Sequence, residues 1–250
     1  MSANRSILAR VCRFALWCAL GWFAITIALV AALRWIDPPT SSFIIHDRIG
    51  NWFAAPKEQY SLRHAWVDWP NIAWTAKVAV ISSEDQRFAA HFGFDLKQIN
   101  NALEERERGK RVRGASTISQ QVAKNLFLWP GQSWIRKGLE AYFTLLIETL
   151  WSKQRILEMY LNMAEFGRGT FGVGAAGQVF FHKPASRLSA SDAALLAAVL
   201  PNPKRMHVDA PSRYVRSRQL WILNQMRRLG GPSVLQEFGS DATQRTQKRQ

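Results

Sequence analysis

The sequence predicts a mainly α-helical protein that begins with one membrane-spanning helix. The first observation is a run of twenty uncharged residues from Phe14 to Leu33, which as a helix would span about 30 Å, the hydrocarbon thickness of a bilayer. The second is that apolar residues between Trp134 and Trp151 recur at steps of three and four, the period of a helix. Alternating patterns are scarce, so the only strands we expect form a short hairpin near Phe43–Phe53.

The composition excludes several classes of protein. Of 250 residues, 48% are hydrophobic and 20% are charged, which is too apolar for a disordered chain. The formal net charge of +15 predicts attraction to polyanions, namely nucleic acid, lipid head groups or phosphorylated substrates. Both cysteines, Cys12 and Cys18, lie in or beside the apolar run, so the rest of the chain holds no disulfide, thiolate nucleophile or cysteine metal site.

The charges that flank the apolar run predict how it is oriented. Arg5, Arg10 and Arg13 precede it and should stay cytoplasmic, which places residues 1–13 inside, a spanning helix at residues 14–34 and the remainder in the periplasm. The alternative is a cleaved signal peptide, with Val30-Ala31-Ala32 as the cleavage site, although the apolar part of such peptides is usually about 7–15 residues long. Outside the cytoplasm we expect no nucleic acid as partner, but lipid phosphates or a phosphorylated substrate.

The rest of the chain reads as one domain. Residues 35–60 form a membrane-proximal segment that opens on the stiff Asp37-Pro38-Pro39, residues 61–238 form the domain, and the polar residues 239–250 form a tail expected to be disordered. Ser152 is a predicted N-cap, and Ser189 to Asp192 has capping-box spacing ahead of a helix that Pro201-Asn202-Pro203 should end.

The first segment whose residues are suited to catalysis is Glu84–Asp95. It follows the apolar run Val78–Ile81, and an acid at the end of a buried segment is well placed for a raised pKa and for proton transfer. The alternative is a solvated helix end carrying an ordinary acid–arginine pair.

The second segment is Gly114–Asn125. Thr117 and Gln120 have capping-box spacing, so a helix should start here, and its free N–H groups favour a phosphate. Gln121 and Lys124 lie on one face and can add donors to the same anion. An ordinary cap with solvated side chains is the alternative.

Two further segments follow. In Arg136–Glu140 the acid lies within reach of Arg136 and Lys137, and the three either form intrahelical ion pairs or point together into a cleft. From Asn162 to Gly177 there are five glycines, which indicates a tight loop where backbone approaches backbone or ligand.

Taken in order, these segments resemble a known family. Glu84–Asp95, Gly114–Asn125, Arg136–Glu140 and Arg155–Asn162, the last running on to Phe166-Gly167, are similar to the motifs of the peptidoglycan glycosyltransferases shared with class A penicillin-binding proteins. The chain resembles the monofunctional biosynthetic branch of that family, over about residues 66–229. The resemblance implies a lysozyme-like, two-lobed fold with a larger head and a smaller jaw that touches the membrane.

The resemblance also implies an activity and its residues. The reaction would polymerise lipid II into a β-1,4-linked glycan, with inversion at the donor sugar and release of undecaprenyl pyrophosphate. Glu84 matches the catalytic base that takes a proton from the acceptor 4-hydroxyl, and Glu140 matches a second acid near the donor pyrophosphate. The substrate-binding positions are Gln120, Gln121, Lys124, Asn125, Arg136 and Lys137, and the supporting positions are Asp85, Phe88, His91, Ser116 and Thr117.

The implied chemistry needs no obligatory cofactor and no protein-bound metal, although a divalent cation, Mg or Mn, can share the charge of the pyrophosphate. The implied partners are lipid II, the nascent glycan strand, membrane lipids, and other cell-wall synthesis and division proteins. Two positions depart from the family pattern. Ala115 replaces a second glycine, and Gln132 stands where many relatives have an arginine, a loss for which Arg168 is a candidate replacement.

Three alternatives stay open at this stage. A lytic hydrolase on a similar fold would use Glu84 as a general acid, but cleaving an uncharged glycosidic bond needs no phosphate clamp. An inert tethered module would bind anionic lipid through its basic surface. The basic stretch 96–113, the expected mobile jaw segment, either faces lipid phosphates or is a solvated helix.

Overall fold

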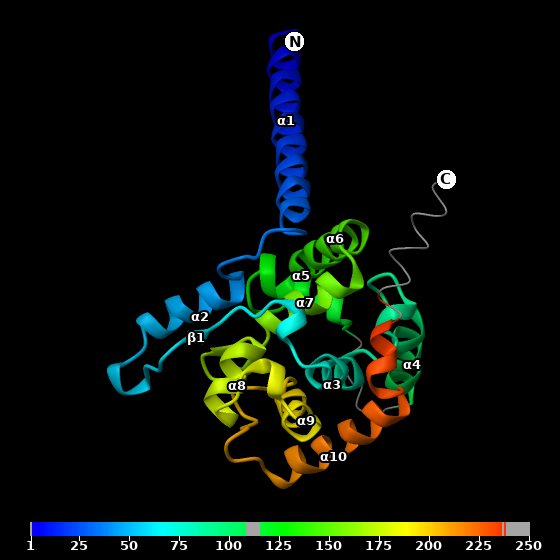
Figure 1. Cartoon of the computed structure of the whole chain (residues 1–250). Helices are drawn as coiled ribbons and strands as arrows, with labels where there is room; N and C mark the ends of the chain where they lie inside the picture. The colour runs from blue at the N-terminus through cyan, green and yellow to red at the C-terminus, as the bar shows by residue number, and fades with distance from the viewer. Residues whose placement is uncertain (1, 109–115, 237, 239–250) are drawn as a thin grey trace.

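The computed structural model describes residues 2–108, 116–236 and 238, and it is mainly helical as predicted. Helix α1 (Ser2–Ala32) projects from one end of the domain that the later elements form (Figure 1). Its stretch Arg10–Ala32 is, among the described residues, the one helix long and apolar enough to cross a membrane. The predicted tail, residues 239–250, and the stretch 109–115, which holds the end of the basic segment, lie outside the described residues.

The head lobe is built around two helices that are buried on nearly all sides. Helices α3 (Trp74–Glu84) and α9 (Ala190–Val199) pack on each other, and α10 (Arg213–Arg228) packs on both. Every residue of α9 from Ala193 to Val199 is buried. A helix that is apolar all round belongs in a core, and its alanines let the neighbouring helices approach closely.

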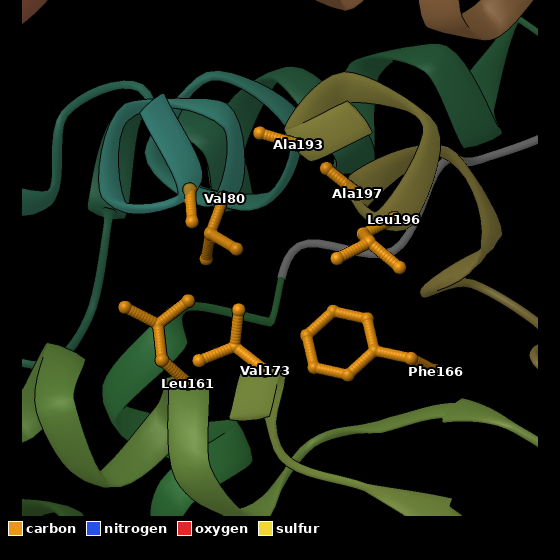
Figure 2. Close-up of a pocket in the computed structure, with 8 residues that line it drawn as sticks. Val80, Leu161, Phe166, Val173, Ala193, Leu196 and Ala197 are labelled. Atoms are coloured by element: carbon orange, nitrogen blue, oxygen red, sulfur yellow. The ribbon is translucent and has the colours of Figure 1, made fainter. Parts of the chain in front are cut away.

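The core continues from the head lobe into the rest of the domain. Figure 2 shows apolar side chains from four elements besides α9 converging on one centre, which leaves no space for a water molecule. These elements are α3, α7 (Lys153–Met163), β2 (Glu165–Gly167) and α8 (Val173–Phe181). The labelled side chains are Val80, Leu161, Phe166, Val173, Ala193, Leu196 and Ala197.

The second lobe consists of helices that begin at the predicted caps. Thr117 and Gln120 form a capping box at the start of α5 (Ile118–Phe127), and Ser152 caps α7. Helix α6 (Trp134–Leu150) covers the predicted periodic segment. The capping box at Ser189 and the end of α9 before Pro201 are confirmed as well. Helix α4 (Leu96–Glu107) holds the described part of the basic stretch.

The hairpin expected near Phe43–Phe53 is wrong, because these residues form helix α2 (Ser42–Trp52). The Ser41 hydroxyl accepts a hydrogen bond from the Ile44 amide and starts the helix, as serine does at N-caps. Ile44 is buried and Asn51 exchanges two hydrogen bonds with the backbone of Tyr60, so positions seven apart face the domain. The isoleucines of this segment are compatible with strands, but the spacing of the residues that face the domain suits a helix.

The few strands form a small sheet in the order β1 (Arg63–His64), β3 (Thr170–Phe171), β2. β1 runs parallel to β3, and β2 runs antiparallel to it.

The predicted close approach in the glycine-rich loop is confirmed at Gly172, which has φ of +82° and whose missing Cβ would lie 2.7 Å from the Asn162 carbonyl oxygen. The short 3-10 helices are η1 (Pro56–Glu58), η2 (Trp69–Asn71), η3 (Phe88–Ala90), η4 (Ala185–Arg187) and η5 (Gly231–Gln236).

Helix α1 is docked onto the domain by specific contacts. The Thr26 and Tyr142 hydroxyls lie 2.8 Å apart, and the Tyr142 ring packs against the rings of Trp22 and Phe23. The Trp151 indole N–H donates to the Val30 carbonyl at 2.7 Å.

One turn further along, the Arg155 guanidinium donates to the carbonyl oxygens of Leu33 and Ile36 and pairs with Asp37. These contacts tie the last turns of α1 and its exit to α6 and α7.

Candidate active site

Glu84 is the last residue of α3, where the buried helix reaches a cleft. Its side chain is 13% exposed. One carboxylate oxygen accepts a hydrogen bond from the Gln121 amide at 3.1 Å, and the other contacts the Arg218 guanidinium at 3.5 Å. Burial raises the pKa of Glu84, while the hydrogen bond from Gln121 and the charge of Arg218 oppose this shift. The raised pKa predicted for Glu84 is therefore found, and the contacts with Gln121 and Arg218 limit the shift by favouring the ionised carboxylate.

Gln121 is held in the orientation that serves Glu84. Its amide oxygen accepts a hydrogen bond from the Tyr160 hydroxyl at 3.3 Å, which leaves its N–H₂ group to donate to the carboxylate. Burial raises the pKa of Tyr160, so its hydroxyl stays protonated and remains a donor. Tyr160 lies in the motif Arg155–Asn162, but the sequence analysis assigned it no role at the site, and Arg218 was not singled out at all.

Glu140 lies at the centre of a cation cluster formed by Lys124, Arg136 and Lys137. The Arg136 guanidinium donates to one Glu140 oxygen at 3.1 Å and the Lys137 ammonium to the other at 2.5 Å. Glu140 is only 3% exposed. Burial lowers the pKa of Lys124, Glu140 opposes this, and Arg136 and Lys137 lower it further, which places all three cations in one electrostatic neighbourhood.

The cation cluster carries more positive than negative charge. One carboxylate faces three cations, and the buried Nε of Arg136 has no hydrogen-bond partner among the residues described. Buried donors are nearly always paired, so this arrangement fits an anionic ligand. Gln121 and Lys124 lie one turn apart on α5, and this helix face links Glu84 to the cation cluster.

The supporting positions fix the geometry around Glu84. The Asp85 carboxylate, 1% exposed, accepts hydrogen bonds from the Ile118 backbone N–H at 3.1 Å and lies 2.9 Å from the His91 ring. The Thr117 hydroxyl donates to the Gly93 carbonyl at 2.6 Å. The start of α5 is therefore pinned to the segment that follows Glu84.

This pinning corrects one expectation, that the free amides at the start of α5 would bind phosphate. The Ile118 amide is taken by Asp85 and the Gln120 amide by Thr117. The Gln120 side-chain oxygen is likewise bound to the Thr117 backbone. The positive charge available to an anion therefore comes from the side chains of the cation cluster rather than from this helix end.

The other predicted residues lie around this centre. Phe88 is fully buried, with the Lys153 ammonium 4.6 Å from its ring centroid. Ser116 is exposed at the edge of the cleft, and Asn125 is half-buried on α5. Gln132 is exposed in the loop before α6.

Arg168, the candidate replacement for an arginine at position 132, lies over the Tyr60 ring, 4.7 Å from its centroid. The consequence of Gln132 stays a prediction.

A buried polar chain that the sequence did not reveal connects α5, α6 and α7. The Ser119 hydroxyl donates to Glu148 at 2.5 Å, and the Lys153 ammonium donates to Glu148 and to the His91 carbonyl. Glu148 is 1% exposed, and the Lys153 ammonium supplies the opposite charge that a buried carboxylate needs.

The donor set around the site does not suit a protein-bound metal. Within residues 2–108 and 116–236, no group of three or more His, Cys, Asp and Glu side chains is placed to hold an ion. Both oxygens of Glu140 are bound by cations, which leaves it a poor metal ligand.

Comparison with known proteins identifies the class of protein. A transglycosylase family model matches residues 51–227. The chain is 52% identical over 233 residues to a biosynthetic peptidoglycan transglycosylase of Pseudomonas entomophila, covering 93% of this chain and 96% of that protein. It is 54% identical over 224 residues to the protein of the same description from Klebsiella oxytoca, covering 89% and 90%. The chain therefore belongs to the transglycosylase family.

Within this class the activity is that of a peptidoglycan glycosyltransferase in cell-wall biosynthesis. The same description applies to a protein of Pseudomonas aeruginosa, 50% identical over 231 residues, covering 92% of this chain and 97% of that one. The resemblance seen in the sequence motifs is thereby confirmed.

Proposed function

We propose that this enzyme polymerises lipid II, with Glu84 as the general base. Glu84 takes the proton from the acceptor 4-hydroxyl as that oxygen attacks the anomeric carbon of the lipid-linked donor. The bond to the pyrophosphate breaks in the same displacement, so the configuration inverts and undecaprenyl pyrophosphate leaves with the bonding electrons. The observation that carries this proposal is a carboxylate of raised pKa linked by one helix face to a cluster with surplus positive charge.

The environment of Glu84 suits a base. A neutral alcohol is a weak nucleophile, and a carboxylate whose pKa is raised accepts its proton more readily. The contact with Arg218 and the Gln121 hydrogen bond favour the ionised form, so the group can be ready before substrate arrives.

The cation cluster suits the leaving group. Negative charge develops on the pyrophosphate during displacement, and Lys124, Arg136 and Lys137 are already gathered to receive it. We assign Glu140 the role of holding Arg136 and Lys137 in place, because each of its oxygens is bound to one of them. A Mg or Mn ion would add charge there only through the phosphate oxygens, and we propose no obligatory cofactor.

The proposed setting is the outer face of the cytoplasmic membrane. Helix α1 would cross the bilayer once with its N-terminus in the cytoplasm, and the domain would lie in the periplasm beside membrane lipids and other cell-wall synthesis and division proteins. The arginines before the apolar run and the length of α1 support this orientation.

The test is incubation of the detergent-solubilised full chain with labelled lipid II, followed by sizing of the product. Wild type should form high-molecular-weight glycan that lysozyme digests. Glu84→Gln should lose at least about 100-fold in rate, the usual contribution of a general base, while its circular dichroism stays unchanged. Glu104→Gln, an exposed acid on α4, is the matched control and should retain activity.

Two outcomes would overturn the proposal. Full polymerisation by Glu84→Gln would show that Glu84 is not the general base. An absence of polymer with wild type would favour an inert lipid-binding module. Release of soluble fragments from purified sacculi would instead indicate a lytic hydrolase.

A further inference from the structure

One face of α10 lines the cleft at Glu84. Ser217 and Arg218 each lie three or four residues from both Tyr214 and Trp221, so the four form one stripe on the helix. All four border a cleft of about 870 Å³ that also contains Glu84. The other face of α10 is buried against the head lobe. The stripe is therefore a wall of the active-site cleft.

Two large aromatic side chains stand exposed on this wall. Tyr214 is 61% exposed and Trp221 is 40% exposed. In Figure 1, α10 lies on the side of the domain opposite α1, so the bilayer does not account for this exposure. Exposed aromatic side chains in a cleft usually serve to bind a ligand.

The chemistry of the cleft differs from that of the cation cluster. Besides the aromatic rings it is lined mainly by hydroxyl and amide side chains, together with two acids, Glu84 and Asp85, and two arginines, Arg87 and Arg218, whose formal charges cancel. The hydroxyls and amides belong to Ser82, Ser83, Ser116, Ser217, Gln86, Gln98 and Gln121. Neutral donors and acceptors together with aromatic faces suit an uncharged ligand with many hydroxyl groups.

Two polar atoms at this cleft await a partner. The Ser82 hydroxyl is fully buried, and the Arg218 Nε is buried as well, and neither has a hydrogen-bond partner in the described part of the chain. Buried polar atoms are rarely left unpaired, so either a bound ligand or a small side-chain movement has to supply each missing bond.

We propose that Trp221 and Tyr214 form an aromatic platform that holds pyranose rings of the glycan in the cleft beside Glu84. The proposal rests on the proposed function and extends it to the sugar. The C–H face of a pyranose packs on an aromatic ring, while its hydroxyl and acetamido groups bind the surrounding serines and glutamines. The pyrophosphate, in contrast, is drawn to the cation cluster. The cleft volume lies within the range of sites for small ligands, roughly 300–1,000 Å³.

The first experiment measures sugar binding without catalysis. Isothermal titration calorimetry of the full chain in detergent with an uncharged β-1,4-linked N-acetylglucosamine oligosaccharide should show binding. Trp221→Leu should weaken the affinity by roughly three- to tenfold, the usual value of an aromatic contact, whereas Trp221→Phe should stay close to wild type. Leu220→Ala is the matched control, because Leu220 is 62% exposed on the same helix and does not line the cleft.

The second experiment identifies which sugar the platform holds. If it holds the acceptor, Trp221→Leu raises KM for lipid II with kcat unchanged. If it holds the growing strand, the same variant shortens the product at constant KM. Unchanged oligosaccharide affinity in Trp221→Leu, or an equal loss in Leu220→Ala, would overturn the platform. Since the binding assay needs no turnover, its result is independent of whether the chain polymerises lipid II.

Discussion

Glu165 should make the stability of the fold depend on pH. It begins β2, and its carboxylate accepts a hydrogen bond from the Gly169 amide at 3.2 Å. Burial raises the pKa of Glu165 to about 7 from 4.5, with the Lys204 ammonium opposing the shift and Asp47 adding to it. The charged form of Glu165 is therefore disfavoured in the folded protein.

The sign and size follow from proton linkage. Between the unfolded pKa of 4.5 and the folded pKa of about 7, the native state holds a proton that the unfolded chain has released. The free energy of unfolding therefore falls by up to about 1.4 kcal/mol per pH unit across this window. Summed over the window, the ionised Glu165 costs roughly 3 kcal/mol above neutrality, and Glu165→Gln should recover that amount.

The assay is urea unfolding of the detergent-solubilised protein, followed by circular dichroism at about pH 4, below the unfolded pKa, and at about pH 8. Glu165→Gln should match wild type at the lower pH and exceed it at the higher one. Glu104→Gln, an exposed acid, should track wild type at both. A difference between Glu165→Gln and wild type that is the same at both pH values would refute the reasoning.

Two further predictions concern packing and the docking of α1. Gly172→Ala should destabilise the fold by about 1–3 kcal/mol, because the φ of Gly172 is +82° and a Cβ would meet the Asn162 carbonyl. Gly50→Ala in α2 is the control and should be neutral or slightly stabilising, because the space around Gly50 is open. Equal melting temperatures for the two variants would contradict this prediction. In a double-mutant cycle, Thr26→Val and Tyr142→Phe should show a coupling of about 0.6 kcal/mol in the free energy of unfolding, and strict additivity would mean that the hydroxyl pair contributes nothing.

The features that local sequence specifies were predicted well. The caps at Thr117 and Ser152 depend on neighbours three residues away, so a short window contains all the information they need. The same holds for Glu140 with Arg136 and Lys137, which meet within one helical turn. The error at α2 has a local cause too, because isoleucines favour strands while the spacing and Ser41 favour a helix.

The features that were missed depend on contacts between distant segments. Arg218 reaches Glu84 across 134 positions, and Asp85 takes the Ile118 amide across 33. Neither periodicity nor motif spacing reveals a contact between segments so far apart. The sequence therefore suggested free amides at the start of α5, where the fold places the Asp85 carboxylate. Glu148 likewise reads as one more acid on an amphipathic helix until Ser119 and Lys153 are seen around it.

The contacts of α1 with α6 and α7 fix the direction in which this helix leaves the domain. The contacts at Thr26 and Val30 occupy successive turns of α1, and Leu33 directly follows its last residue. Each residue added between Thr26 and Val30 would advance the helix by about 1.5 Å and turn it by about 100°. A single insertion there would break the match with Tyr142, Trp151 or Arg155. Replacing α1 with an unrelated apolar helix would lose these contacts, so the direction of the helix relative to the cleft would no longer be fixed.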